Sequence, residues 1–287
     1  METDITYGAF VARMRELGHV DGESIVLDWR FAEGRYERLP GFAKELVDSG
    51  VDVILAMTPP SVQAAKAATR TIPIVMVAVG DPVALGFVPS FSRPGGNITG
   101  VSNAIDDVSR KYLELLREAV PGLSRVVALV NPDNPNVRNI YRQIEAAGRA
   151  MGIAVSAVEA NTAPRIEQGF EAMRRAGTEA VIVQGDGFLF VQRALIAELA
   201  LKNRLATMFW TPEAVRAGAL MSYGQPVSED YRKAANYVDR ILKGAQPRDL
   251  PVDQPTEVQL TLNLRTAKAL GLTIPRELLL RAGEVVE

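Results

Sequence analysis

The chain has 287 residues, enough for two modest domains or one large one. Its 32 basic and 34 acidic residues give a formal net charge of -2, which leaves no broad basic field for nucleic acid or an anionic membrane. The lack of cysteine and the presence of one histidine exclude disulfides, thiolate catalysis and a multi-histidine metal cluster. No apolar run is long enough to cross a membrane as a helix, so we expect a protein that does not itself span one.

The first 18 residues predict an amphipathic helix rather than a signal peptide. They read "METDITYGAFVARMRELG", acidic at first, with Phe10, Met14 and Leu17 at helical spacing. His19 follows between two glycine turn signals and is expected to be an exposed loop residue.

Residues 24 to 223 alternate short β-branched runs with longer amphipathic stretches. The runs expected to form strands are "SIVLDWRF", "VDVILAM", "IPIVMVAV", "NITGVS", "RVVALVN", "IAVSAVEA", "EAVIVQG", "ATMFW" and "ALMSYG". Between most of them lie stretches with helical period, such as "PSVQAAKAAT", "SRKYLELLREAV" and "IEQGFEAMRRAG". This alternation predicts right-handed βαβ units, parallel sheets and an α/β fold.

A break in the alternation divides the chain into two Rossmann-like lobes. Residues 79 to 96 show neither the strand nor the helix period, and a fresh series follows, so the first lobe is expected to end near residue 101. A later helix, "SEDYRKAANYVDRILKG", has Ser228 as its expected N-cap. Pro251 and Pro255 then predict that the next β-run starts as an edge strand or a crossover.

Ligands of open parallel sheets bind beyond the carboxyl ends of the strands, so the residues that follow each strand are the candidate site. These candidates are Thr58, Ser61, Asp81, Asn131, Asp133, Gly185, Asp186, Trp210 and Tyr223. They are short polar side chains, a glycine and two aromatics. Such a set suits a small polar or zwitterionic ligand with an apolar part.

Each polar candidate has a structural alternative. Thr58 and Ser61 begin a helix whose free N–H groups favour a carboxylate, or they are helix caps and nothing more. Asp81 either binds a ligand ammonium or caps the turn that follows it. Asp186 has the same two alternatives, with ligand contact favoured because its flanking glycines permit close backbone approach.

The aromatic candidates have alternatives too. Trp210 and Tyr223 follow strands, where they form walls of a ligand site or are partly buried in the core. Phe87 and Phe91 lie in the irregular segment and are expected to pack onto the protein rather than to contact a ligand.

No catalytic or cofactor motif is present. The sequence lacks G-x-x-x-x-G-K-[ST], a G-x-G-x-x-G between strand and helix, and G-x-S-x-G. Carboxylates such as Asp28, Glu33, Asp81 and Asp186 are available for acid/base chemistry, but their spacing does not pair them. We therefore expect no enzyme, no cofactor and no metal.

Several motifs together resemble a known family. "AEGRYERLP", "IPIVMVAVGDPV" and "SRPGGNITGVS" occur in that order, and "GALMSYG" and "NLRTAKALGLTIP" follow later. From about residue 8 to its end, the chain resembles the ABC transporter substrate-binding proteins of the tryptophan/tyrosine-type uptake family.

The resemblance implies a type I periplasmic-binding fold, in which two lobes joined by three crossovers close over a solute. The crossovers are expected near residues 101–103, 223–225 and 250–256. The first lobe is expected to comprise residues 1–101 with 225–248, and the second residues 102–224 with 249–287. The implied ligand is a small amphipathic solute such as an amino acid, with aromatic amino acids favoured, and the implied partner is an ABC permease in the membrane.

Family members normally start with an export signal and a first strand before the helix that here ends in "ELG". That helix begins almost at Met1, so both are expected to be missing, through a start-site error, a truncation or divergence of a paralogue. The resemblance implies a periplasmic or extracytoplasmic location. Three other functions stay open: the ligand-sensing core of a regulator or receptor, a truncated nonbinding paralogue, and an enzyme on the same scaffold.

Overall fold

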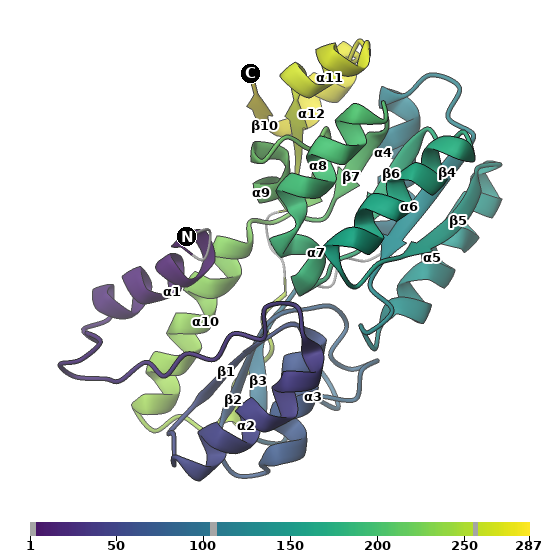
Figure 1. Ribbon diagram of the computed structural model, residues 1–287. Coiled ribbons are helices and arrows are strands. Elements are labelled where there is room, and N and C mark those ends of the chain that lie inside the picture. The colour runs from purple at the N-terminus through teal and green to yellow at the C-terminus, as the bar shows by residue number, and fades with distance from the viewer. Residues whose placement is uncertain (1–3, 104–107, 255–257) are drawn as a thin grey trace. The chain divides into compact units, whose positions relative to one another are not determined.

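The structure, a computed structural model, describes residues 4–103, 108–254 and 258–287 (Figure 1). The chain divides into two compact units. Unit 1 comprises Met1–Ala104 with Pro226–Thr256, and unit 2 comprises Ile105–Gln225 with Glu257–Glu287. The predicted α/β class is confirmed, with sheets in which parallel pairing dominates.

Unit 1 contains a parallel sheet of three strands in the order β1-β2-β3. The strands are β1 (Ile54–Met57), β2 (Ile74–Val79) and β3 (Ile98–Ser102). Its helices are α1 (Asp4–Glu16), η1 (Tyr36–Arg38), α2 (Leu39–Asp48), α3 (Thr58–Ala68), α10 (Val227–Leu242) and η2 (Pro247–Asp249). β2 and β3 are buried along their whole length, as expected for strands covered on both faces. Helix α1 packs along α10, which in turn packs on β2 and β3 (Figure 1).

Unit 2 contains a sheet of seven strands in the order β10-β9-β8-β7-β6-β4-β5. The strands are β4 (Arg125–Val130), β5 (Ala154–Glu159), β6 (Ala180–Val183), β7 (Ala206–Phe209), β8 (Met221–Gly224), β9 (Gln259–Asn263) and β10 (Ala282–Val286). The helices are α4 (Val108–Ala119), α5 (Val137–Met151), α6 (Ala163–Arg175), α7 (Gly187–Val191), α8 (Arg193–Lys202), α9 (Pro212–Arg216), α11 (Leu264–Leu270) and α12 (Arg276–Arg281). All neighbours pair in parallel except β8 and β9, which are antiparallel.

The third crossover belongs to a different unit than the sequence predicts. Residues from 249 onward were expected in the second lobe, but residues 249–254 fall in unit 1, where the backbone of Asp253 pairs with β3. Ser102 N donates to Asp253 O at 2.8 Å, and Asp253 N donates to Gly100 O at 2.9 Å. The other two boundaries lie at residues 104 and 225 rather than 101 and 224. The expected crossovers near 101–103 and 250–256 run into residues 104–107 and 255–257, which lie outside the described residues.

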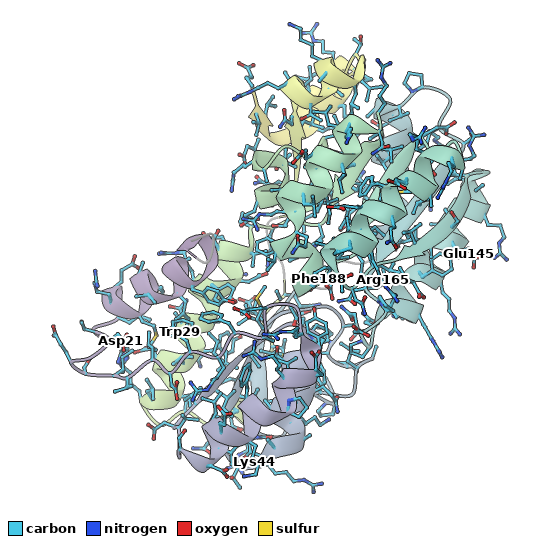
Figure 2. The ribbon with its side chains drawn as sticks, viewed as in Figure 1. Asp21, Trp29, Lys44, Glu145, Arg165 and Phe188 are labelled. Carbon is cyan, nitrogen blue, oxygen red and sulfur yellow. The ribbon has the colours of Figure 1, made fainter. Side chains whose placement is uncertain are left out.

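The predicted strand "SIVLDWRF" does not form. From Ile25 to Arg30 the side chains alternate between half-buried and exposed, as in a strand, but the only pairing described for this segment is a single bridge between Asp21 and Ile25. Alternation sets which face of an extended chain is buried, whereas a strand also requires a neighbour for its N–H and C=O groups. Side-chain contacts hold the segment instead: the Trp29 ring, labelled in Figure 2, lies 5.3 Å from the Tyr7 ring of α1.

The irregular segment between β2 and β3 packs as expected. Phe87 is buried in the core of unit 1, and Phe91 is half-buried against the same core. The β-run after Pro251 was predicted to start as an edge strand or a crossover, and at Asp253 it forms only an isolated bridge. The strand that follows, β9, lies between β8 and β10 and is not an edge strand.

The expectation that His19 is an exposed loop residue is wrong. Its side chain is 17% exposed, and its Nε2 lies 2.8 Å from Asp239 Oδ1 on α10. Lys243 Nζ lies 2.7 Å from the same oxygen. Burial pushes the pKa of Asp239 upward, but hydrogen bonds from Lys243 and His19 outweigh it and hold the pKa below its ordinary value of 3.8. The His19–Asp239 contact holds the loop after α1 against α10. It is a long-range contact, which local turn signals do not reveal.

Asp239→Asn should lower the free energy of unfolding by about 1 kcal/mol at neutral pH, because the charged hydrogen bonds are lost. Since the folded-state pKa lies below 3.8, this stabilisation is present above that pH and is lost as the pH falls below it. Urea unfolding of wild type and variant at a series of pH values from 7 down to 2 measures the difference. Asp48→Asn, in the exposed pair with Lys44, is the matched control and should have little effect. A difference between wild type and Asp239→Asn that did not shrink at low pH would contradict this account.

Gly100→Ala should destabilise unit 1 by more than about 2 kcal/mol. Gly100 in β3 has φ +133, and an added Cβ would lie 2.2 Å from Met76 O on the neighbouring strand. Gly50→Ala is the control, because Gly50 also has positive φ but has no atom within 4 Å of its Cβ position, so it should cost only about 1 kcal/mol. Urea unfolding followed by Trp29 fluorescence in a Trp210→Phe background reports on unit 1. Equal losses for the two variants would show that the clash is relieved by movement of β2.

Candidate functional site

The carboxyl ends of β1 and β2 in unit 1 carry an unusual backbone. Thr58, directly after β1, has φ +70, which is a costly conformation for a β-branched residue. Ala78 near the end of β2 has φ +52, at a register shift between Met76 and Val79. Such strain persists only where the surrounding structure enforces it, and it is concentrated at functional sites in proteins. The backbone is therefore distorted at the same strand ends that the sequence predicts as candidate ligand sites in unit 1.

The start of α3 is not capped by Thr58 or Ser61. The N-cap residue is Met57, and no side chain makes a capping hydrogen bond there. Thr58 is buried, with 7% of its surface exposed, and Ser61 is half-buried. Pro59 and Pro60 supply no N–H, so this helix start offers a carboxylate fewer donors than an ordinary helix N-terminus. Ligand contact by Thr58 and Ser61 stays a prediction.

Asp81 caps the turn after β2. Its Oδ1 accepts hydrogen bonds from Val83 N at 2.9 Å and Ala84 N at 3.0 Å. The side chain is exposed. The turn-capping alternative is therefore realised, and contact of Asp81 with a ligand ammonium stays a prediction.

Tyr231 of α10 lies beside the end of β1, a placement that the sequence analysis missed. Its hydroxyl donates to Met57 Sδ at 2.8 Å, and its ring lies 5.4 Å from the Tyr7 ring. Burial raises the pKa of Tyr231 well above its ordinary value, so the phenol stays protonated and acts as a donor. The only signal available was its place on the apolar face of a helix, which does not distinguish it from any core residue.

The polar and aromatic candidates of unit 2 lie at the ends of four neighbouring strands. The sheet order β8-β7-β6-β4 brings Tyr223, Trp210, Asp186 and Asn131 to one edge, although they are far apart in the sequence. The parallel pairing of β7, β6 and β4 aligns their carboxyl ends. The structure therefore brings these four residues to the same end of the sheet, and their contact with a ligand stays a prediction.

Asp186 is the centre of a buried hydrogen-bond network. Its Oδ1 accepts from Asn131 Nδ2 at 3.1 Å and from the N–H groups of Phe188 and Leu189 at 2.9 and 3.1 Å. Its Oδ2 accepts from Asn134 Nδ2 at 2.9 Å. Phe188, labelled in Figure 2, lies in α7, so the carboxylate caps this helix and ties the loop after β4 to it. With these donors engaged, Asp186 acts first as the support of the strand-end loops, and its contact with a ligand stays a prediction.

The neighbours of this network differ in exposure. Asn134 is buried with 1% exposed and was not among the predicted residues, although it stands in the same "NPDN" stretch as Asn131. Asp133 is exposed and accepts from Asn161 Nδ2 at 2.9 Å. Gln184, directly after β6, was also missed: it is 2% exposed, and its Oε1 accepts from Asn131 N at 3.0 Å.

Trp210 and Tyr223 are half-buried at adjacent strand ends. The Trp210 indole covers Gly185, since an added Cβ there would lie 3.6 Å from it, and the indole lies 5.9 Å from the Phe190 ring. The Tyr223 ring lies 5.9 Å from Lys111 Nζ. Both aromatics pack on the core of unit 2 but keep part of their surface accessible. Partial burial in the core is therefore realised, and their role as walls of a ligand site stays a prediction.

Among residues 4–103, 108–254 and 258–287, no group of three or more His, Asp or Glu side chains is arranged to hold a metal ion. In the same residues, no helix has the length and apolar character that crossing a membrane requires.

Asp186→Asn should destabilise unit 2 by about 2 kcal/mol, because an amide cannot accept all four hydrogen bonds and sets a donor against a donor. Asp133→Asn is the matched control, since that exposed side chain should change stability by less than about 0.5 kcal/mol. Urea unfolding followed by Trp210 fluorescence in a Trp29→Phe background measures both variants. Similar midpoints for Asp186→Asn and Asp133→Asn would show that the buried network adds no stability.

Comparison with known proteins gives a consistent result. Residues 3–286 match the model of a family described as ABC transporter substrate binding protein. A curated tyrosine-binding protein of Clostridioides difficile is 27% identical over 265 residues, covering 92% of this chain and 75% of the relative.

Two solved structures share the fold. A conserved domain protein from Vibrio cholerae has a TM-score of 0.91 and 25% identity, covering 98% of this chain and 94% of that one. An ABC domain from Streptococcus pneumoniae in complex with L-Trp has a TM-score of 0.90 and 24% identity, covering 99% and 95%. The family match spans nearly every residue and confirms the resemblance drawn from the sequence motifs. The chain belongs to the ABC transporter substrate-binding protein family.

Proposed function

We propose that this protein binds an aromatic amino acid or a closely related small amphipathic solute and delivers it to an ABC permease, without catalysis. The observation that carries the proposal is the pair of half-buried aromatics, Trp210 and Tyr223, at adjacent strand ends beside a buried polar network. An aromatic ring binds between such side chains by stacking and edge contacts, while nearby polar groups hold its charged end.

The named relatives support this ligand class. One curated relative is a tyrosine-binding protein, and one structure of the same fold holds L-Trp. The two ligands share an aromatic ring and an α-amino acid group. The same argument supports a periplasmic or extracytoplasmic location, where solute-binding proteins of ABC importers meet their permease. Closure of two lobes over the solute stays a prediction of the family resemblance.

The chemistry of the candidate residues supports a non-catalytic role. The best-placed carboxylate, Asp186, is engaged by four donors and is therefore poorly placed to exchange protons with a substrate. A binding experiment separates the nonbinding paralogue from the proposal, because a nonbinding protein gives no signal.

L-tyrosine and L-tryptophan should each raise the melting temperature and give saturable heats in titration calorimetry. At a ligand concentration of 100 times Kd, the stabilisation should be about 2.7 kcal/mol. L-leucine and the D-enantiomers serve as the ligand controls. If none of the aromatic amino acids bound at millimolar concentration, the proposal would be wrong.

Tyr223→Ala should weaken binding of the aromatic amino acids roughly tenfold or more, because stacking surface is lost. Tyr141→Ala is the matched control: Tyr141 on α5 is also a half-buried tyrosine packed on the core of unit 2, but it is not at a strand end. It should lower stability and leave Kd unchanged. Equal effects of the two variants on Kd would contradict a role of Tyr223 in binding.

A further inference from the structure

Two buried N–H donors stand at the ends of adjacent strands of unit 2. Gln184 directly follows β6, and Trp210 directly follows β7. Gln184 Nε2 and Trp210 Nε1 are both buried, and neither has a hydrogen-bond partner among the residues the structure describes. A buried donor without an acceptor costs about 1 to 3 kcal/mol, so two of them at one edge of a sheet require a reason.

The orientation of the Gln184 amide follows from its neighbours. Asn131 N–H lies 3.0 Å from Oε1, and a backbone donor requires an acceptor there. The NH2 group is therefore the end that lacks a partner. The Gln184 side chain is only 2% exposed, so solvent at the surface cannot satisfy it.

The obvious acceptors nearby are already engaged. Both oxygens of Asp186 accept from donors of its own network. Asn131 Oδ1 accepts from Asp133 N at 3.0 Å. The Trp210 ring is held by its packing on Gly185 and Phe190, which limits rotation toward another acceptor.

Other partnerless buried groups in unit 2 have a different setting. Ser222 and Thr261 have hydroxyls without a partner, but they lie inside β8 and β9 and face each other in register. They are fully buried within the sheet, whereas Gln184 and Trp210 lie beyond the last residues of their strands. Of the two pairs, only Gln184 and Trp210 lie at the carboxyl ends of strands, where ligands of parallel sheets bind.

We propose that Gln184 and Trp210 are specificity-determining donors that hold an oxygen acceptor of the bound solute. The inference rests on the proposed function and deepens it, because it requires of the ligand a hydrogen-bond acceptor at the β6 and β7 ends. The start of α3 offers few N–H donors, so Gln184 and Trp210 are better suited to bind such an oxygen. Two oxygens of an aromatic amino acid fit the requirement: the carboxylate that all of them have, and the phenolic oxygen that only tyrosine has.

Gln184→Glu tests the donor with little change of shape. The variant keeps an oxygen for Asn131 N–H but replaces the NH2 group by a second acceptor. Binding should weaken at least tenfold in titration calorimetry. Trp210→Phe, which keeps an aromatic ring and removes the N–H, should also weaken binding. Thr261→Val, which removes a buried partnerless hydroxyl away from the strand ends, is the control and should leave Kd unchanged.

The source of the oxygen is read from a comparison of ligands. An equal loss for L-tyrosine and L-phenylalanine on Gln184→Glu assigns the carboxylate, and a loss confined to L-tyrosine assigns the phenolic oxygen. Both outcomes support the inference. If Gln184→Glu and Trp210→Phe both bind the amino acids with the Kd of the wild type, the inference is overturned and the proposed function stands.

A second measurement does not depend on the ligand class. The indole N–H resonance of Trp210 should move downfield when an acceptor-bearing solute binds, and that of Trp29 in unit 1 is the internal reference. The probes are a panel of amino acids, hydroxy acids and polyols. A shift with a hydroxy acid or polyol alone supports the donor role and rejects the amino acid function. If no probe moves the Trp210 resonance relative to Trp29, the inference is overturned.

Discussion

A single buried carboxylate organises the strand ends of unit 2. Asp186 lies in the loop after β6 and joins it to the loop after β4 and to the first turn of α7, because both of these contribute donors to its two oxygens. A buried charge is tolerated only when such bonds replace its hydration. The loops are thereby fixed relative to one another. The neighbouring Gln184, Trp210 and Tyr223 are presented on a rigid edge, and rigidity at a site reduces the entropy lost when a ligand binds.

The two units reach order at their strand ends by different means. Unit 2 uses a hydrogen-bond network and aromatic packing, whereas unit 1 uses a distorted backbone at Thr58 and Ala78. The buried Tyr231 hydroxyl also contacts Met57, from a helix more than 170 residues away in the sequence. Both devices set the chain after a strand into one conformation. One does so with side-chain bonds, the other with main-chain geometry enforced by surrounding contacts.

The fold was largely readable from the sequence because periodicity and strand-end position are local properties. They predicted the α/β class, most strands and the segment in which Phe87 packs inward. The failures are all long-range. His19 is tied to Asp239, Asp253 pairs with β3, and the segment after Gly22 lacks a described neighbouring strand. In the candidate site, strand ends could be named, but Gln184 and Asn134 could not be distinguished from other polar residues. Their importance depends on which partner each atom has, and this depends on the three-dimensional arrangement.

The segment from Ile25 to Phe31 separates two properties that usually occur together. Its side chains are anchored on α1 by edge contacts of the Trp29 and Phe31 rings with Tyr7, and these two rings stack on each other 6.0 Å apart. Its peptide groups, in contrast, lack a ladder in the described structure. Side-chain packing, rather than backbone hydrogen bonding, therefore holds this segment in one conformation. Its amide protons should exchange with deuterium far faster than the burial of its tryptophan would suggest, so that solvent protection and immobility are decoupled along one stretch of chain.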